Sequence, residues 1–350
     1  DSTTPMLPDI FSSKETLRAA FEEGLDRQLS DEGLGTYILV LANALFEESL
    51  FNRLSDRLEQ RFKEIRHRYA ERLRHGRALT DAPDDVMVFL KLVAMRFRHL
   101  TMTEYRLNDS WELQFNQLRS LRPKRLSGDM VTHLSVAFDP AKFHFNKPFL
   151  DKEILWKGTL YDLPVSLLYN KFPFVPLHGL LVPEPLKNHP QMLNARMHTM
   201  FWKLTQDAGR NIPGIGFAYN GFGAGASINH LHLQMFVRQT SLPVMHPRWL
   251  HNGGQEEYPA ACLVFDDPDE AWLYISSLHH ANTTYNLVYL PGKMVCLPRR
   301  YQGSFKLPAW CENFAWYEMC GGMTTYDIDD YRNLETDEII EALASTRTPY

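Results

Sequence analysis

Residues 225–234 read GASINHLHLQ, and this stretch decides how the rest of the chain is interpreted. On a β-strand, side chains alternate between two faces, so His230, His232 and Gln234 share one face and the leucines between them share the other. A row of polar groups on one face of a buried strand is costly unless the groups are paired or used. The stretch therefore predicts either a reactive row of side chains or a set of buried, satisfied histidines.

Three interpretations of this row stay open from the residues alone. A neutral imidazole such as that of His232 can attack the phosphorus of a phosphate ester without a separate base, giving a covalent intermediate that a second nucleophile resolves. Two imidazoles on one face also suit zinc, but a third ligand is needed, and His144, His178 and Cys262 show no metal-like spacing. In the third interpretation the histidines are structural and satisfied by their neighbours.

The residues in front of the histidines favour a phosphate-binding loop. The stretch GAGAS at 223–227 supplies close backbone approach, N–H donors and a hydroxyl for phosphate oxygens. Gln234 adds a neutral amide that can hold a further oxygen. The sequence contains no G-x-x-x-x-G-K-[ST] and no G-x-G-x-x-G pattern, which excludes a P-loop and a Rossmann site.

The bulk composition indicates a globular chain without a large charge excess. Its 350 residues are 44% hydrophobic, enough for one large or two medium domains. The formal net charge of -5 gives no reason to expect nucleic acid or an anionic membrane as a partner. The longest apolar run, Gly35 to Phe46, is shorter than the roughly 20 residues of a membrane span and predicts a core helix. The N-terminal residues lack the features of an export signal, so a cytoplasmic location is expected.

The periodicity of the chain changes near residue 105. Residues 1–105 carry helical spacing and predict a helical N-terminal region, whose arginine-rich stretch at 61–77 keeps RNA binding open as an alternative. The residues beyond 105 form short runs rich in β-branched and aromatic residues, with only occasional helical stretches, which predicts an antiparallel α+β fold. The predicted strands are 111–118, 131–138, 165–172, 178–185, 214–220, 230–237, 262–267, 285–291 and 293–300, and the predicted helices are 189–209 and 268–282.

These motifs resemble the histidine triad superfamily, and the glutamine that ends H-x-H-x-Q places the resemblance with its nucleotidyltransferase and phosphorylase branch. LYNKFPFVPLHGLLVPEP at 168–185 is similar to the strand, turn and strand of the family, and FAYNGFGAGAS at 217–227 to its phosphate loop. QFNQLRSLRPKR at 114–125 looks like the Q-x-N-x-x-R and basic tail of the GDP-hexose phosphorylases of the GDP-L-galactose and GDP-D-glucose type. That group is the most similar, and diadenosine tetraphosphate phosphorylases come next.

The resemblance implies a role for each matching residue. His232 is the implied nucleophile, with Gln234 and His230 as its catalytic neighbours. The implied nucleotide-binding and phosphate-binding residues are Asn170, Asn220, Gly225, Ser227, Lys147, Arg119 and Phe145, with Arg122, Lys124 and Arg125 as further basic candidates. No metal and no cofactor are implied. The chain departs from the family pattern at Cys320 and Gly322, where serine and histidine are usual.

The resemblance also implies two histidine-triad-like lobes with an antiparallel sheet. The catalytic lobe is expected at about 106–240 and a degenerate lobe at about 241–345, within a nucleotidyltransferase domain at 106–345. Residues 285–300 repeat the strand, turn and strand of 168–185 but lack the histidine triplet.

The implied activity is that of a phosphorylase that cleaves a GDP-hexose-like nucleoside diphosphate sugar through a nucleotidyl-histidine, with phosphate or a sugar phosphate as acceptor. The alternatives are a diadenosine tetraphosphate phosphorylase or adenylyltransferase, and a nucleotide sensor or RNA-binding protein that uses the helical N-terminal region. The expected partners are a nucleotide or nucleotide sugar and phosphate, without a membrane or nucleic acid, and a homodimer stays open.

Overall fold

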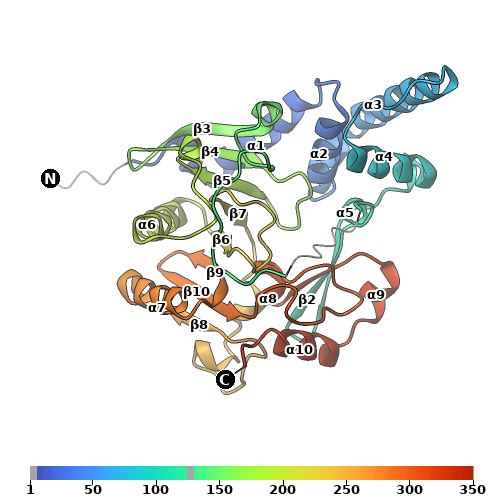
Figure 1. The fold of residues 1–350 in the computed structure, drawn as a ribbon. Helices are drawn as coiled ribbons and strands as arrows, with labels where there is room; N and C mark the ends of the chain where they lie inside the picture. Colours follow the sequence, from blue (N-terminus) through green and yellow to red (C-terminus); the bar gives the residue numbers. More distant parts are fainter. Residues whose placement is uncertain (1–5, 124–129, 350) are drawn as a thin grey trace.

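The centre of the molecule is an eight-stranded sheet, in a computed structural model that describes residues 6–123 and 130–349 (Figure 1). The strand order is β3-β4-β5-β7-β6-β9-β10-β8. The strands are β3 (Ile154–Leu160), β4 (Leu163–Tyr169), β5 (Gly179–Pro183), β6 (Ile215–Asn220), β7 (Leu233–Val237), β8 (Leu263–Phe265), β9 (Thr284–Leu290) and β10 (Lys293–Arg299). Every neighbouring pair in this sheet is antiparallel, so the predicted α+β class is confirmed.

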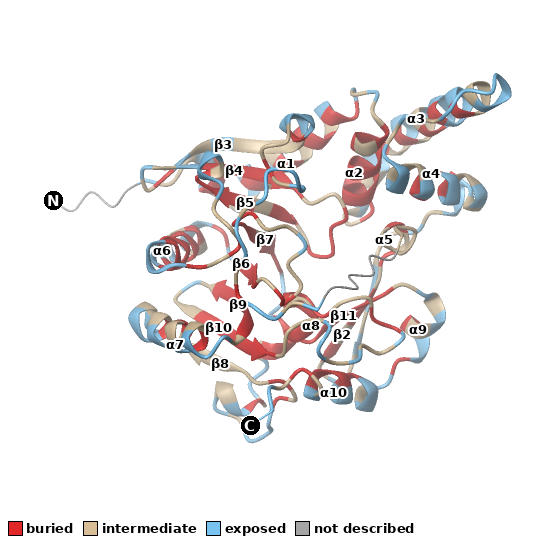
Figure 2. Cartoon of the chain, in the orientation of Figure 1, coloured by how far each residue is buried: buried red, intermediate tan, exposed pale blue. Residues whose placement is uncertain are grey.

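The sheet is built from two halves that meet at β6 and β9. The first half, β3 to β7, carries helix α6 (Ala195–Asn211), and the second half, β8 to β10, carries α7 (Pro268–His280). At the junction Asn220 pairs with Asn286 in the antiparallel register, and their side chains share a hydrogen bond of 2.8 Å. Figure 2 shows buried residues along both β6 and β9. The two halves therefore share one continuous sheet.

The two lobes differ in how their strands are connected. β9 and β10 are joined only by Pro291 and Gly292, a tight turn in which Gly292 has φ +76. Residues 170–178 form a longer connection between β4 and β5. The β9–β10 hairpin, with its two-residue turn, therefore matches the β3–β4 hairpin, which is joined by Tyr161 and Asp162, more closely than it matches the stretch 168–185.

Helices form the predicted N-terminal region, which packs against β3 and β4. They are α1 (Lys14–Gln28), α2 (Leu34–Ala44), α3 (Glu48–Arg74) and α4 (Pro83–Met95). α2 is buried throughout, as predicted for the apolar run in this part of the chain. α1 approaches β4 so closely that a Cβ added at Gly24 would lie 2.0 Å from the hydroxyl of Tyr169. On α3, ion pairs such as Arg61–Glu64 and Arg74–Glu71 partly neutralise the arginine-rich face.

A smaller three-stranded sheet lies beside the main one among the described residues. Its strands are β1 (Glu104–Asn108), β2 (Trp111–Phe115) and β11 (Gly322–Thr325), and the nearby helices are α5 (Gln117–Ser120), α8 (Trp316–Met319), α9 (Ile328–Asn333) and α10 (Thr336–Ala344). β11 runs parallel to β2. Residues 104–115 therefore pair with the C-terminal segment, although the sequence-based boundary at about 106 groups them with the catalytic lobe.

A buried ion pair ties the small sheet to the main one. Arg238, directly after β7, donates two hydrogen bonds of 3.0 Å to the two carboxylate oxygens of Glu112 on β2. Tyr317 donates to the same carboxylate. Because the pair is bidentate and shares a third partner, it satisfies charges that would otherwise be costly to bury.

The predicted strand 131–138 is wrong. This segment is irregular, and its backbone carbonyls at Val136 and Ala137 accept hydrogen bonds from the side chain of Asn229 rather than from a neighbouring strand. Cys296, Cys311 and Cys320 are buried free thiols, and Cys262 is a half-buried one. In the part of the chain that the structure describes, no helix has both the length and the apolar character of a membrane span.

Candidate active site

His232 lies directly before β7 with its imidazole held in one tautomer. Its Nδ1 lies 2.7 Å from the carbonyl oxygen of His230. Because a carbonyl oxygen can only accept, Nδ1 carries the proton and Nε2 keeps its lone pair. Burial lowers the pKa of His232 to about 4, so the ring is neutral near pH 7. The site therefore presents an unprotonated imidazole nitrogen.

His230 is held in the opposite tautomer. Its Nε2 lies 3.1 Å from the carbonyl oxygen of Pro185, and its Nδ1 accepts from the backbone N–H of Phe145 at 3.1 Å. Burial and the nearby His232 lower its pKa to about 4. Since both nitrogens of His230 already have partners, the two imidazoles could share a metal only by breaking these bonds. Within residues 6–123 and 130–349, no group of three or more His, Cys, Asp or Glu side chains is placed to hold a metal ion.

The strand that carries this row is shorter than the predicted 230–237, because β7 begins at Leu233. The peptide of His232 is instead paired by a side chain. Gln191 accepts from His232 N–H at 2.9 Å and donates to its carbonyl at 3.2 Å and to the carbonyl of Asn220 at 2.9 Å. The fully buried Gln191 thus acts as a strand partner for the peptide of His232, a role that the sequence alone did not reveal.

Gln234 on β7 has a fixed amide orientation. Its Oε1 accepts from the indole Nε1 of Trp316 at 2.8 Å and lies 3.0 Å from Nε2 of His178. An indole nitrogen can only donate, so the oxygen is assigned without ambiguity. His178 is buried and neutral, with a pKa lowered to about 3, and its Nδ1 accepts from Phe174 N–H, so its Nε2 carries the proton. Within residues 6–123 and 130–349, the amide Nε2 of Gln234 has no hydrogen-bond acceptor, so its N–H groups are available.

The proposed phosphate loop is held by the second lobe. Asn220 accepts through Oδ1 from Asn286 at 2.8 Å and from the backbone N–H of Trp316 at 2.9 Å. Gly225 has φ +93, and its N–H donates to Gln302 at 2.9 Å. Ser227 is exposed on the same loop. Asn220 and Gly225 thus shape the loop through bonds to β9 and to the residues after β10, and Ser227 faces solvent.

Phe145 and Asn170 lie close to the row. The Phe145 ring centroid is 5.0 Å from that of His232 and 5.4 Å from that of His230, so this buried ring packs against both imidazoles. Asn170 accepts through Oδ1 from Phe172 N–H at 3.0 Å, and its amide nitrogen lies 3.3 Å from Nε2 of His178. Both residues therefore lie next to the row formed by His230, His232 and Gln234.

The basic candidates have varied surroundings. Lys147 donates to the carbonyl of Pro140 at 3.0 Å, and Arg119 donates to the carbonyl of Phe172 at 2.7 Å. Arg122 forms an ion pair of 3.3 Å with Glu312. Lys124 and Arg125 lie outside the described residues.

The two departures from the family pattern have a packing context. A Cβ at position 322 would lie 2.2 Å from the ring of Tyr317, which leaves no room for histidine in this backbone. Cys320 is fully buried next to it.

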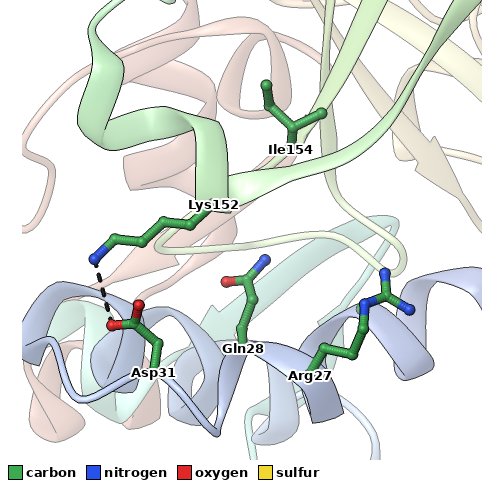
Figure 3. Close-up of a pocket in the computed structure, with 6 residues that line it drawn as sticks. Arg27, Gln28, Asp31, Lys152 and Ile154 are labelled. Atoms are coloured by element: carbon green, nitrogen blue, oxygen red, sulfur yellow. Dashed lines mark hydrogen bonds and ion pairs between the residues drawn. The ribbon is translucent and has the colours of Figure 1, made fainter.

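A cavity of about 220 Å³ lies apart from these residues, between α1 and β3 (Figure 3). Figure 3 shows Lys152 paired with Asp31 across it, at 3.4 Å. Its lining residues are Gly24, Arg27, Gln28, Asp31, Lys152 and Ile154. None of them belongs to the set around His232.

Comparison with known proteins finds a match that contains part of this site. Residues 109–236 match the family model described as GDPGP1-like, N-terminal domain. GDP-D-glucose phosphorylase 1 of Macaca fascicularis is 31% identical over 144 residues, which cover 37% of this chain and 35% of that protein. The Homo sapiens protein of the same name is 34% identical over 121 residues, 31% of this chain and 29% of that protein. The matched part thus spans a minority of each relative.

The fold has a relative among solved structures. Yeast Ap4A phosphorylase in complex with Ap4A aligns with a TM-score of 0.50 and 18% identity, covering 77% of this chain and 100% of that chain. The resemblance to GDP-hexose phosphorylases first and Ap4A phosphorylases next is confirmed. The GDPGP1-like segment contains His230, His232 and Gln234, whereas Trp316 and Asn286 reach the site from outside it.

Proposed function

We propose that the chain is a nucleotidyltransferase of the phosphorylase type, which cleaves a GDP-hexose at its α-phosphate with inorganic phosphate as acceptor. The observation that carries the proposal is the fixed orientation of two side chains, the imidazole of His232 and the amide of Gln234. Among the residues that the structure describes, neither Nε2 of His232 nor Nε2 of Gln234 has a hydrogen-bond partner, so the first offers a lone pair and the second its N–H groups. The similarity of residues 109–236 to proteins named GDP-D-glucose phosphorylase supports the substrate class.

In the first step Nε2 of His232 attacks the α-phosphorus. A P–N bond forms, the bond between the α-phosphorus and the bridging oxygen breaks, and hexose 1-phosphate leaves with that oxygen. In the second step an oxygen of inorganic phosphate attacks the same phosphorus, the P–N bond breaks, and GDP is released. His232 Nδ1 keeps its proton throughout, and the His230 carbonyl stabilises the cationic ring of the intermediate.

The neighbouring residues have distinct roles in this scheme. Gln234 donates to a non-bridging oxygen in both steps, and the exposed hydroxyl of Ser227 approaches from the loop that Asn220 and Gly225 shape. Asn170 binds the ribose hydroxyls. Lys147 can turn toward the outer phosphate, because among the described residues its ammonium group donates to a backbone carbonyl, that of Pro140, and forms no ion pair with a carboxylate.

Mass spectrometry tests the covalent step directly. The protein is incubated with GDP-hexoses without phosphate, and a guanylyl group is expected on His232. Addition of phosphate should remove the adduct and release GDP. His232→Ala should stay folded, form no adduct and lose turnover by several orders of magnitude. His279→Ala, which removes a half-buried histidine of α7, should keep both the adduct and the turnover. Normal turnover by His232→Ala would contradict the mechanism.

Ap4A is the second candidate substrate, because the structural relative with a TM-score of 0.50 was solved with it. The same attack on an α-phosphorus would place an adenylyl group on His232. Including Ap4A in the substrate panel separates the two, because the adducts differ in mass. Tight nucleotide binding without any adduct or turnover would instead indicate a sensor.

A further inference from the structure

The connection that follows β4 is held by side chains instead of by a neighbouring strand. Four of its carbonyl oxygens, at residues 170, 172, 173 and 174, accept hydrogen bonds from side chains of other segments. The donors are Asn43 to residue 170 at 3.0 Å, Arg119 to residue 172 at 2.7 Å, Asn116 to residue 173 at 2.8 Å and Gln114 to residue 174 at 2.7 Å. Lys171 in between forms an ion pair of 2.6 Å with Asp85 of α4.

The order of these donors follows from the local structure. Gln114 and Asn116 are two residues apart at the end of β2, so their side chains point the same way. Asn116 caps α5, and Arg119, one helical turn later, lies on the same side as Asn116. The three donors therefore meet carbonyls 174, 173 and 172 in reverse order, like a strand partner made of side chains. Asn43, Gln114 and Asn116 are buried, so water does not replace their amides.

Both ends of this connection lead to the proposed catalytic row. At the first end Asn170 has its carbonyl bonded to Asn43 and its side-chain oxygen bonded to Phe172 N–H. At the other end Phe174 N–H donates to Nδ1 of His178, whose Nε2 lies 3.0 Å from Gln234 Oε1. A displacement of residues 172–174 would therefore reach the ribose contact and the amide of Gln234 together.

We propose that Asn43, Gln114, Asn116 and Arg119 are positioning residues for the nucleotide site. They hold residues 170–174 so that Asn170 meets the ribose and His178 holds Gln234. The helical N-terminal region, through Asn43 of α2, is thereby part of the nucleotide-binding machinery. The identity of the ligand rests on the proposed function, whereas the holding of residues 170–174 does not.

Replacing one amide by a carboxylate tests the role with little change in shape. Asn116→Asp keeps the oxygen that caps α5 but places an acceptor opposite the carbonyl of Pro173. Asn43→Asp likewise places an acceptor opposite the backbone carbonyl of Asn170. Asn211→Asp is the control for an added carboxylate away from the site, because its amide donates to the carbonyl of Phe11; its side chain is exposed, unlike those of Asn43 and Asn116. If Asn43→Asp does not fold, the positioning role is tested with Asn116→Asp and Asn43→Ala instead.

The kinetic measurement compares GDP-hexose with its 2′-deoxyguanosine analogue. Both site variants should lose about tenfold in kcat/KM for GDP-hexose, the effect of one displaced hydrogen-bonded contact, and clearly less for the analogue that lacks the hydroxyl. The control should keep the wild-type ratio between the two substrates. An equal loss on both substrates would overturn the role assigned to Asn170 at the ribose, and no loss on either would overturn the positioning role as a whole.

Amide hydrogen exchange gives a second readout that needs no substrate. The N–H groups of Phe172 and Phe174 should exchange faster in both site variants and at the wild-type rate in Asn211→Asp. Unchanged exchange would overturn the inference even if turnover changed. If the wild-type protein turns over none of the substrates but the variants show this exchange pattern, the proposed function is contradicted and the positioning inference is kept.

Discussion

Trp316→Phe tests whether the orientation of Gln234 controls turnover. The indole of Trp316 stacks on Phe236, with ring centroids 5.1 Å apart and an interplanar angle of 14°, and its Nε1 donates to Gln234 Oε1 at 2.8 Å. Phenylalanine keeps an aromatic ring at this place and removes the N–H. The substitution therefore separates the hydrogen bond from most of the stacking.

The expected loss follows from what the bond holds. A buried acceptor that loses a donor costs about 1–3 kcal/mol, although His178 still donates to the same oxygen, which favours the lower half of that range. With one donor left, the amide can turn its oxygen toward the phosphate and repel it. We expect kcat to fall about fivefold to thirtyfold, since each 1.4 kcal/mol corresponds to about tenfold in rate.

The assay is steady-state turnover of GDP-hexose with phosphate. Trp111→Phe is the matched control, because Trp111 is equally buried and its Nε1 has no hydrogen-bond partner within the described ranges. Both variants lose a similar indole volume, so their unfolding free energies should fall by comparable amounts. Only Trp316→Phe should lose turnover. In the double variant Trp316→Phe, Gln234→Ala, the Trp316 change should add little to the loss from Gln234→Ala.

Two outcomes would refute this reasoning. If Trp316→Phe turned over like wild type, the indole bond would not control the amide. If the losses from the two substitutions simply multiplied in the double variant, Trp316 would act independently of Gln234.

Three further outcomes concern stability, measured by urea unfolding. Burial lowers the pKa of His232 to about 4, so between pH 7 and pH 5 the unfolded chain binds a proton that the folded chain does not. The free energy of unfolding should therefore fall by about 2 kcal/mol over this range because of His232. His232→Gln should make this fall smaller. Arg238→Met leaves the Glu112 carboxylate buried without its cation and should cost about 3–5 kcal/mol. Gly24→Ala should cost at least about 1 kcal/mol, because its methyl group meets Tyr169. Unchanged midpoints would contradict each expectation.

The sequence predicted what depends on neighbours along the chain. Alternation and turn residues located most strands of the main sheet, and helical spacing located α6, α7 and the N-terminal region. The H-x-H-x-Q pattern also identified the residues of the row, because the spacing of two survives although β7 begins only at Leu233.

The sequence did not reveal partners that arrive from far along the chain. Gln191, Asn286 and Trp316 reach the row only through folding, and none of them stands at a distinctive spacing from His232. The segment 131–138 alternates like a strand but has no sheet neighbour, so tertiary contacts override its pattern. Arg119 suggested phosphate binding by its charge, whereas its contacts are to a carbonyl and to the ring of Phe174.

The pairing of β6 with β9 constrains how the chain can be shortened. A fragment that ends after β7 lacks β9 and leaves the N–H and C=O groups of β6 without partners along an apolar edge. Such an edge readily pairs with another copy of itself, so the fragment should self-associate. Expression of the first lobe alone would therefore yield aggregates, and useful truncation points lie outside both lobes.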